Sequence, residues 1–340
     1  MTGTWSVAAR FSESISVLEG LKKAVGNSAN IVYAKGSNLV EDEVLEANST
    51  LFGKSLRRDK RSAEELRNEA LRVAKNADVI VAAVGEAAEM SGEASSRTDI
   101  QIPETQKELI RALLRTGKPV VLVLFTGRPL VLKWEEENVP AILNVWFGGS
   151  EAGDAIADVL FGDVNPSGKL TTTFPQHVGQ VPIYYAHKNT GRPLSGPWFQ
   201  KFQSNYLDVS NDPVYPFGFG LSYTQFTYGE VKLNKTSMRA TETIQVTVEL
   251  TNSGTRDGAE VVQLYIRDRV GSVTRPVKEL KGFQKVQLAV GEKKEVTFDI
   301  TNEMLSFYRN DMTFGSEPGE FDVFVGGNSR DVKSVSFVLE

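Results

Sequence analysis

The hydrophobic pattern of this chain changes about two thirds of the way along its 340 residues, which restricts the folds available to it. In the first part, short apolar runs alternate with stretches of helical period, the runs at 30–34, 79–84, 119–125 and 141–145 and the helices at 62–75, 104–115 and 151–160. This alternation predicts a doubly wound, mostly parallel α/β sheet with helices on both faces. The run at 79–84 is wholly apolar, so we expect a strand buried on both sides.

The last part, from Phe226, alternates with the period of two that is typical of strands, as in Ile244, Val246, Val248 and Leu250. Turn signals separate the runs, which predicts an immunoglobulin-like or fibronectin-III-like sandwich. The segment between the two patterns has no period and is rich in Pro, Gly and aromatic residues, so we expect a packed connector. The predicted domains are 1–172, the α/β sandwich, 173–225, the irregular aromatic connector, and 226–340, the fibronectin type III-like domain.

Composition excludes several classes of function. A net charge of −5 disfavours a nucleic-acid partner, which needs a basic face. No run of about 18 apolar residues occurs, so no membrane span is expected, and the first residues lack the features of a signal peptide. Cysteine is absent and there are 2 histidines, which argues against thiol chemistry and zinc hydrolysis. We expect no metal and no cofactor.

Motifs for other chemistries are incomplete. Gly85 follows a strand but Ala87 and Met90 break the dinucleotide pattern, and the stretch 162–170 has the wrong glycine spacing for a phosphate loop. Ser150 sits between a strand and a helix like a hydrolase nucleophile, yet Ala152 replaces the final glycine of that motif. A serine hydrolase thus stays a minor alternative, and we expect Ser150 to cap the following helix.

Three glutamates lie on the loop after the apolar run at 79–84, where open α/β sheets keep their chemistry: Glu86, Glu89 and Glu93. Gly92 and the small residues after Glu93 make the backbone adaptable, so this side chain can project. Arg97 is close enough in the chain to orient a carboxylate. Glu86 lies nearer the sheet and could instead accept hydrogen bonds from backbone amides. Spacing alone leaves open whether these carboxylates are catalytic or simply solvated.

The chain resembles glycoside hydrolase family 3, including its bacterial periplasmic β-glucosidases, over essentially its whole length. The likeness rests on several segments: Ser91-Gly-Glu-Ala-Ser-Ser-Arg97, Gly127-Arg-Pro129, Trp146-Phe-Gly-Gly-Ser-Glu-Ala-Gly153 continuing to Leu170, Ala186-His-Lys-Asn-Thr-Gly-Arg-Pro193 and Tyr215-Pro-Phe-Gly-Phe-Gly-Leu-Ser-Tyr-Thr224. The resemblance implies the second domain of that family followed by its fibronectin-III-like domain.

The resemblance also implies a retaining mechanism, in which a nucleophilic carboxylate and an acid/base carboxylate stand about 5 Å apart. Glu93 matches the acid/base position, and Ser91 and Arg97 are expected to bind the substrate or to support Glu93 from behind. The family's nucleophile is an aspartate in a Ser-Asp-Trp or Ser-Asp-His motif of an N-terminal (β/α)8 barrel, and neither motif occurs here.

From this likeness we expect the C-terminal portion of a longer periplasmic or extracellular enzyme, with the first strand of its sheet missing. The expected partners are a β-glucoside or oligosaccharide substrate and the barrel of the same polypeptide. The chain alone is expected to be inactive. The alternative is a non-catalytic module that completes the wall of a barrel's active site or contacts carbohydrate weakly.

Overall fold

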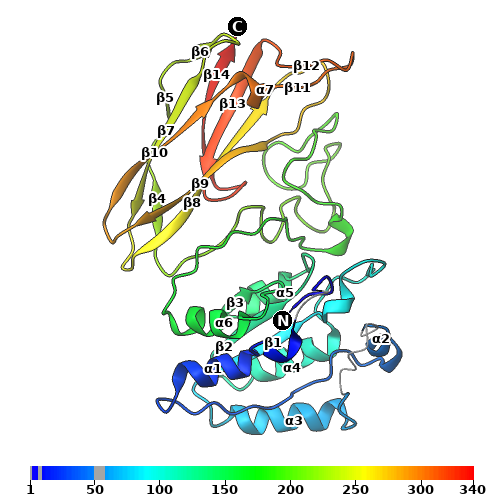
Figure 1. Cartoon of the computed structure of the whole chain (residues 1–340). Coiled ribbons are helices and arrows are strands. Elements are labelled where there is room, and N and C mark those ends of the chain that lie inside the picture. Colours follow the sequence, from blue (N-terminus) through cyan, green and yellow to red (C-terminus); the bar gives the residue numbers. More distant parts are fainter. Residues whose placement is uncertain (1, 7–9, 50–57) are drawn as a thin grey trace. The chain divides into compact units, whose positions relative to one another are not determined.

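The computed structural model describes residues 2–6, 10–49 and 58–340 of the chain (Figure 1). The chain divides into two compact units. The first comprises Met1–Val164 and Pro175–Gly179, and the second comprises Asn165–Phe174 and Gln180–Glu340. No helix among the described residues is long and apolar enough to cross a bilayer.

The first unit is built on a parallel sheet with the order β1 (Ile80–Gly85), β2 (Val120–Phe125) and β3 (Ala141–Asn144). Gly85 pairs with Phe125 at the end of the β1–β2 register. Because parallel strands end at the same edge, the segments that leave β1 and β2 start side by side. The predicted α/β class is therefore confirmed, and its sheet brings two loops together.

Helices cover both faces of this sheet. Within the described residues they are α1 (Val17–Val25), α2 (Glu43–Asn48), α3 (Ala63–Ala74), α4 (Glu104–Leu114), α5 (Lys133–Asn138) and α6 (Ala152–Phe161), with the 3-10 helices η1 (Phe11–Glu13) and η2 (Ala88–Met90). On one face α6 packs against β2, where Val123 joins a cluster with Ala152 and Ile156. Helix α4 packs against β1 on the other face, where Ala82 and Val84 of β1 are buried.

The local signals for two helices are confirmed. The Ser62 side chain accepts a hydrogen bond from the Glu65 amide, and Glu65 bonds back to Ser62, which completes the predicted capping box of α3. Pro103 stands at the N-cap of α4. It lacks the N–H that a helix start leaves unbonded, so it fits there without loss.

Three local expectations are wrong. Residues 30–34 form no strand, and Val32 and Tyr33 are 59% and 64% exposed, because no neighbouring strand pairs with this apolar run. Strand β1 is buried on one face only, since Val81 on the other face is 36% exposed. Ser150 does not cap α6: the N-cap is Glu151, which makes no side-chain capping bond. Ser150 instead offers its carbonyl to the Ile15 amide at 2.8 Å.

The second unit is a β-sandwich, as the alternating pattern predicts. Its described strands are β4 (Phe226–Tyr228), β5 (Lys232–Leu233), β6 (Ser237–Met238), β7 (Ile244–Asn252), β8 (Gly258–Asp268), β9 (Glu279–Leu288), β10 (Lys293–Ile300), β11 (Phe307–Tyr308), β12 (Phe314–Gly315), β13 (Gly319–Gly326) and β14 (Val332–Leu339). The short helix α7 (Asn302–Leu305) precedes β11. One sheet has the order β10–β7–β4 with β5 on β7, and the other has the order β6–β14–β13–β8–β9.

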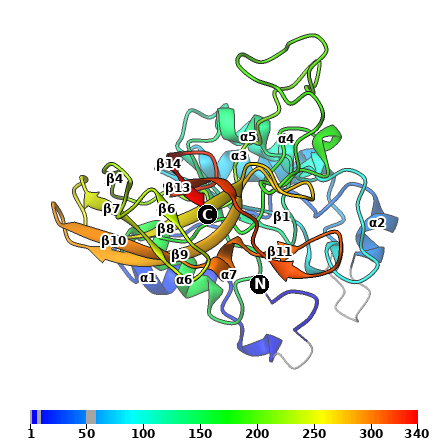
Figure 2. The same cartoon turned by 90° about the horizontal axis from the view of Figure 1, so that it is seen from above.

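In both views β10 and β7 run side by side, and so do β13 and β14 (Figures 1 and 2). The inward residues of the strands form one core, in which Val248, Leu264 and Val323 are almost fully buried. Alternation therefore points the apolar side chains inward and leaves the polar ones to solvent.

Part of the irregular stretch before this sandwich packs on it. This stretch contains the 3-10 helix η3 (Val178–Gln180) and otherwise consists of loops. Tyr185 stacks on Phe217 with ring centroids 4.4 Å apart and meets Tyr265 of β8 edge-on at 5.7 Å. The Tyr185 hydroxyl accepts a hydrogen bond from the Leu280 amide at 3.2 Å. Aromatic contacts thus hold this segment in place.

Candidate active-site loop

The loop that carries the three glutamates leaves the sheet at a fixed point. Gly85 ends β1 with a φ of 126°, and a Cβ there would lie 1.9 Å from the carbonyl oxygen of Phe125. Only glycine permits both the backbone angle and the close strand contact. The side chain of Gln106 on α4 bonds both the N–H (2.7 Å) and the C=O (3.0 Å) of Gly85. The start of the loop is therefore held by the sheet and by α4.

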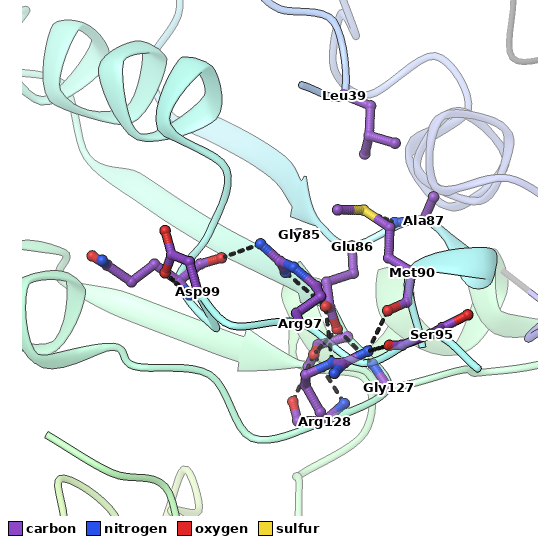
Figure 3. A network of polar contacts seen from close by, with 12 residues as sticks. Leu39, Gly85, Glu86, Ala87, Met90, Ser95, Arg97, Asp99, Gly127 and Arg128 are labelled. Carbon is purple, nitrogen blue, oxygen red and sulfur yellow. Dashed lines mark hydrogen bonds and ion pairs between the residues drawn. The ribbon is translucent and has the colours of Figure 1, made fainter. Parts of the chain in front are cut away.

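Glu86, the next residue, turns inward. Its side chain is 0% exposed, and its Oε1 atom lies 2.7 Å from Arg97 Nη1 and 3.1 Å from Arg128 Nε. Its Oε2 atom accepts hydrogen bonds from the Thr126 hydroxyl at 2.9 Å and from the Gly127 amide at 3.3 Å. Figure 3 shows Arg97 and Arg128 converging on this carboxylate. Glu86 is thus enclosed by protein groups, which leaves it no room to contact a substrate.

Arg128 also reaches the flanks of the loop. Its Nη2 atom donates hydrogen bonds to the carbonyl oxygens of Met90 and of Ser95, the latter at 2.8 Å (Figure 3). From the N-terminal segment, Thr4 Oγ1 donates to the carbonyl oxygen of Ala88 and lies 3.2 Å from that of Ser91. The backbone is therefore fixed before and after the stretch 92–94.

Glu93 lies in that stretch and is exposed. Its carboxylate makes no hydrogen bond or ion pair with the residues that the structure describes. The next residue, Ala94, has a φ of 57°, so the chain turns sharply here. Glu89 is half-buried. Of the three glutamates, Glu93 is the one placed to meet a molecule from outside.

The other predicted site residues, Ser91 and Arg97, are less exposed than Glu93. Ser91 Oγ is buried without a hydrogen-bond partner among the described residues, and a Cβ on Gly127 would lie 1.8 Å from it. Arg97 is 17% exposed in its side chain and also donates to the carbonyl oxygen of Gln101 at 3.3 Å. Arg97 therefore orients a carboxylate as the sequence suggested, but that carboxylate is Glu86 and not Glu93.

Arg128, Thr126 and Thr4 were not recognised as site residues from the sequence. Arg128 belongs to the segment Gly127-Arg-Pro129, so the motif was visible while its contact to the loop was not. The described residues hold no group of three or more His, Asp or Glu side chains arranged to bind a metal ion. Among the described residues, the Ser150 hydroxyl shows no hydrogen bond to a basic side chain of the kind that a serine nucleophile needs.

The chain matches two known domain families and several known enzymes. Residues 1–223 match the Glycosyl hydrolase family 3 C-terminal domain, and residues 260–329 match the Fibronectin type III-like domain. A periplasmic β-glucosidase of Salmonella typhimurium is 50% identical over 99% of this chain and 44% of its own length. A β-xylosidase of Formosa agariphila is 43% identical over 96% of this chain and 42% of its own length.

The fold is shared with solved enzymes. The crystal structure of a β-glucosidase from Listeria innocua in complex with isofagomine superposes with a TM-score of 0.87 at 39% identity, covering 99% of this chain and 44% of that one. The chain thus spans less than half the length of the relatives it matches. It belongs to glycosyl hydrolase family 3, and it comprises that family's C-terminal domain followed by a fibronectin type III-like domain.

Proposed function

We propose that this chain supplies the proton donor, Glu93, of a retaining β-glucosidase. In this proposal it works in one polypeptide with an N-terminal family 3 domain that carries the nucleophilic aspartate. The observation that carries the proposal is the contrast on one loop: Glu86 is enclosed, whereas Glu93 is an exposed carboxylate between two anchored flanks. The Salmonella relative, named a periplasmic β-glucosidase, supports both the reaction and a periplasmic location.

The chemistry needs two carboxyl groups in sequence. The nucleophile attacks the anomeric carbon while the Glu93 carboxylic acid gives its proton to the departing glycosidic oxygen, which leaves as an alcohol. The resulting Glu93 carboxylate then takes a proton from water, whose oxygen displaces the enzyme carboxylate from the sugar. Glu93 ends the cycle protonated again. In the proposed arrangement Ser91 and Arg97 act behind Glu93 as supports of the loop and contribute to substrate binding through it.

The first experiment compares the 340-residue chain alone with the same chain joined to the N-terminal family 3 domain of the Salmonella relative. We expect no turnover of p-nitrophenyl β-D-glucoside by the chain alone, because one carboxylate cannot complete the double displacement. The joined protein should be active, and a parallel assay with the β-xyloside tests the sugar preference. Activity in the chain alone that Glu93→Gln abolishes would contradict the need for a second domain.

A second experiment assigns the role of Glu93 in the joined protein. Glu93→Gln should lower the hydrolysis of glucosides with poor leaving groups by about 10²–10⁴-fold. The loss in kcat/KM, which reports the first displacement, should be far smaller for 2,4-dinitrophenyl glucoside, whose leaving group departs without a proton. Glu89→Gln, on the same loop, is the matched control. Equal losses for all leaving groups, or none, would show that Glu93 is not the proton donor and favour the non-catalytic module.

A further inference from the structure

One guanidinium group holds both sides of the Glu93 turn. Arg128 Nη2 bonds the carbonyl oxygen of Met90 on the upstream side and that of Ser95, at 2.8 Å, on the downstream side. The segment between these carbonyls contains Gly92 and small residues, which have little stiffness of their own. The turn's own internal bonds are weak: the Ser95 amide donates to the Gly92 carbonyl at 3.3 Å, and the Ser95 hydroxyl donates to the Glu93 carbonyl at 3.3 Å.

Arg128 is itself fixed to the sheet. Its Nε atom pairs with Glu86, which directly follows β1, and its amide donates to the hydroxyl of Thr126, which directly follows β2, at 3.2 Å. The Thr126 hydroxyl in turn lies 2.9 Å from Glu86 Oε2. Two strand ends, one buried carboxylate and one arginine thus form a continuous connection from the sheet to the loop (Figure 3).

We propose that Arg128 is a positioning residue that fixes where Glu93 stands. Its catalytic consequence rests on the proposed function of Glu93, whereas its effect on the loop does not. The two carbonyl bonds set the ends of the turn, and Thr4 also bonds carbonyl oxygens of the upstream flank. Preorganisation of this kind matters because a misplacement of about 1 Å can reduce a rate by about 10²-fold.

The direct test is hydrogen exchange of the backbone amides in the 340-residue chain. The amides of Met90, Ser91 and Ser95 have hydrogen-bond partners within the loop and serve as reporters. Arg128→Gln should accelerate their exchange at least about tenfold, because the loop loses two bonds from a charged donor. The amides of β2 should keep their exchange rates, which shows that the sheet remains folded.

Arg128→Lys provides the second variant in case the glutamine variant does not fold. Lysine keeps a positive charge beside Glu86, but its single ammonium lacks the fork that spans two carbonyls while pairing with a carboxylate. We expect the same faster exchange in the loop with an intact sheet. Arg97→Gln is the matched contrast, since Arg97 shares Glu86 but bonds Gln101 and not the flanks of the turn. Unchanged exchange in the Arg128 variants would overturn the proposal.

The catalytic readout uses the chain joined to the N-terminal domain. Arg128→Lys should lower kcat/KM for poor leaving groups by about 10-fold to 10²-fold, with kcat/KM for 2,4-dinitrophenyl glucoside nearly unchanged. Arg67→Gln, which breaks a surface pair with Glu108, is the control. If the Arg128 variants show faster loop exchange but the losses in Glu93→Gln do not depend on the leaving group, the proposed function is refuted and the positioning of the loop by Arg128 stands. If the losses in Glu93→Gln depend on the leaving group but the Arg128 variants show unchanged loop exchange, only the positioning role of Arg128 is refuted.

Discussion

At the scale of single residues, two glutamates of one loop have opposite surroundings. The Glu86 carboxylate is shielded from water and instead contacts two arginines, a hydroxyl and a backbone amide. Burial of a carboxylate is tolerated only with such compensation. Glu93 has none of these partners and remains in solvent. The same residue type is therefore enclosed as a structural anchor at one position and lies in solvent at the other, where we propose proton transfer.

We predict that Glu86→Gln lowers the free energy of unfolding by about 3 kcal/mol, because Arg97 and Arg128 then lose a buried counter-charge. Urea denaturation followed by circular dichroism measures the change. Glu89→Gln should stay within about 0.5 kcal/mol of the parent, as expected for a substitution without such partners. Equal stabilities of the two variants would show that the ion pairs contribute little.

Lys278 has a pKa that is lowered to about 8 from its ordinary value of 10.5, because burial disfavours the charged ammonium. Its Nζ atom donates to the carbonyl oxygen of Ser329 at 2.6 Å and lies 4.5 Å from the ring centroid of Phe324. The unfolded chain therefore binds the proton more tightly than the folded one. This group weakens folding below pH 8, and the penalty is relieved as the pH rises toward 10.5.

We predict that the Lys278 signal titrates near pH 8 in an NMR titration of 13C-methylated lysines. Lys278→Met should remove this signal. The variant should also lose the part of the stability increase between pH 8 and 10.5 that belongs to this residue. A midpoint above pH 10 for Lys278 would show that the ammonium is well solvated.

At the scale of elements, helices α1 and α6 approach each other through glycine. A Cβ on Gly20 would lie 2.1 Å from the carbonyl oxygen of Gly153, and one on Gly153 would lie 2.3 Å from that of Ser16. Backbone therefore packs on backbone at this crossing. Any side chain would force the helices apart.

We predict that Gly20→Ala destabilises the chain by about 1–3 kcal/mol through overpacking. The sign is diagnostic, because alanine at an uncrowded helix position would instead stabilise by about 1 kcal/mol. Chemical denaturation distinguishes the two outcomes. Gly191→Ala, where a Cβ would meet nothing within 4 Å, is the control and should be nearly neutral.

Elements with a strong local signal could be predicted from the sequence. The capping box at Ser62, the proline before α4 and the apolar runs of β1 to β3 each depend on neighbouring residues in the chain. The strand expected at 30–34 does not form, because a strand also needs a partner, which no local pattern contains. The exposed face of β1 was missed for the same reason: coverage depends on helices elsewhere in the chain.

The site shows the same limit. The sequence placed three glutamates and Arg97 on one loop, and family likeness singled out Glu93. Which glutamate turns inward depends on Thr126, Gly127 and Arg128, which lie some 40 residues further along the chain. Long-range contacts of this kind follow from the sheet register, which places the ends of β1 and β2 side by side, and no local sequence pattern contains that register.

At the scale of the whole molecule, each unit has its own core. The fibronectin type III-like match, residues 260–329, lies within the second unit, whereas the family 3 C-terminal match, residues 1–223, extends from the first unit into the second. The first unit contains the loop with Glu93, whereas the sandwich of the second contains no part of that loop. The proposed reaction needs a second carboxylate besides Glu93. We therefore expect activity only in the joined polypeptide, which the comparison of the chain alone with the joined protein tests.

The sheet of the first unit has a further consequence for the behaviour of the chain in solution. Among the described residues β1 pairs with β2 alone, so its other edge presents unpaired backbone groups beside Val79 and Val81, which are 53% and 36% exposed. Such an edge is a template for pairing with another chain. We predict an apparent mass that rises with concentration in sedimentation experiments and rises less in Val81→Lys; a constant mass would contradict this. Self-association through a strand edge would then limit the concentrations at which the isolated chain stays monomeric.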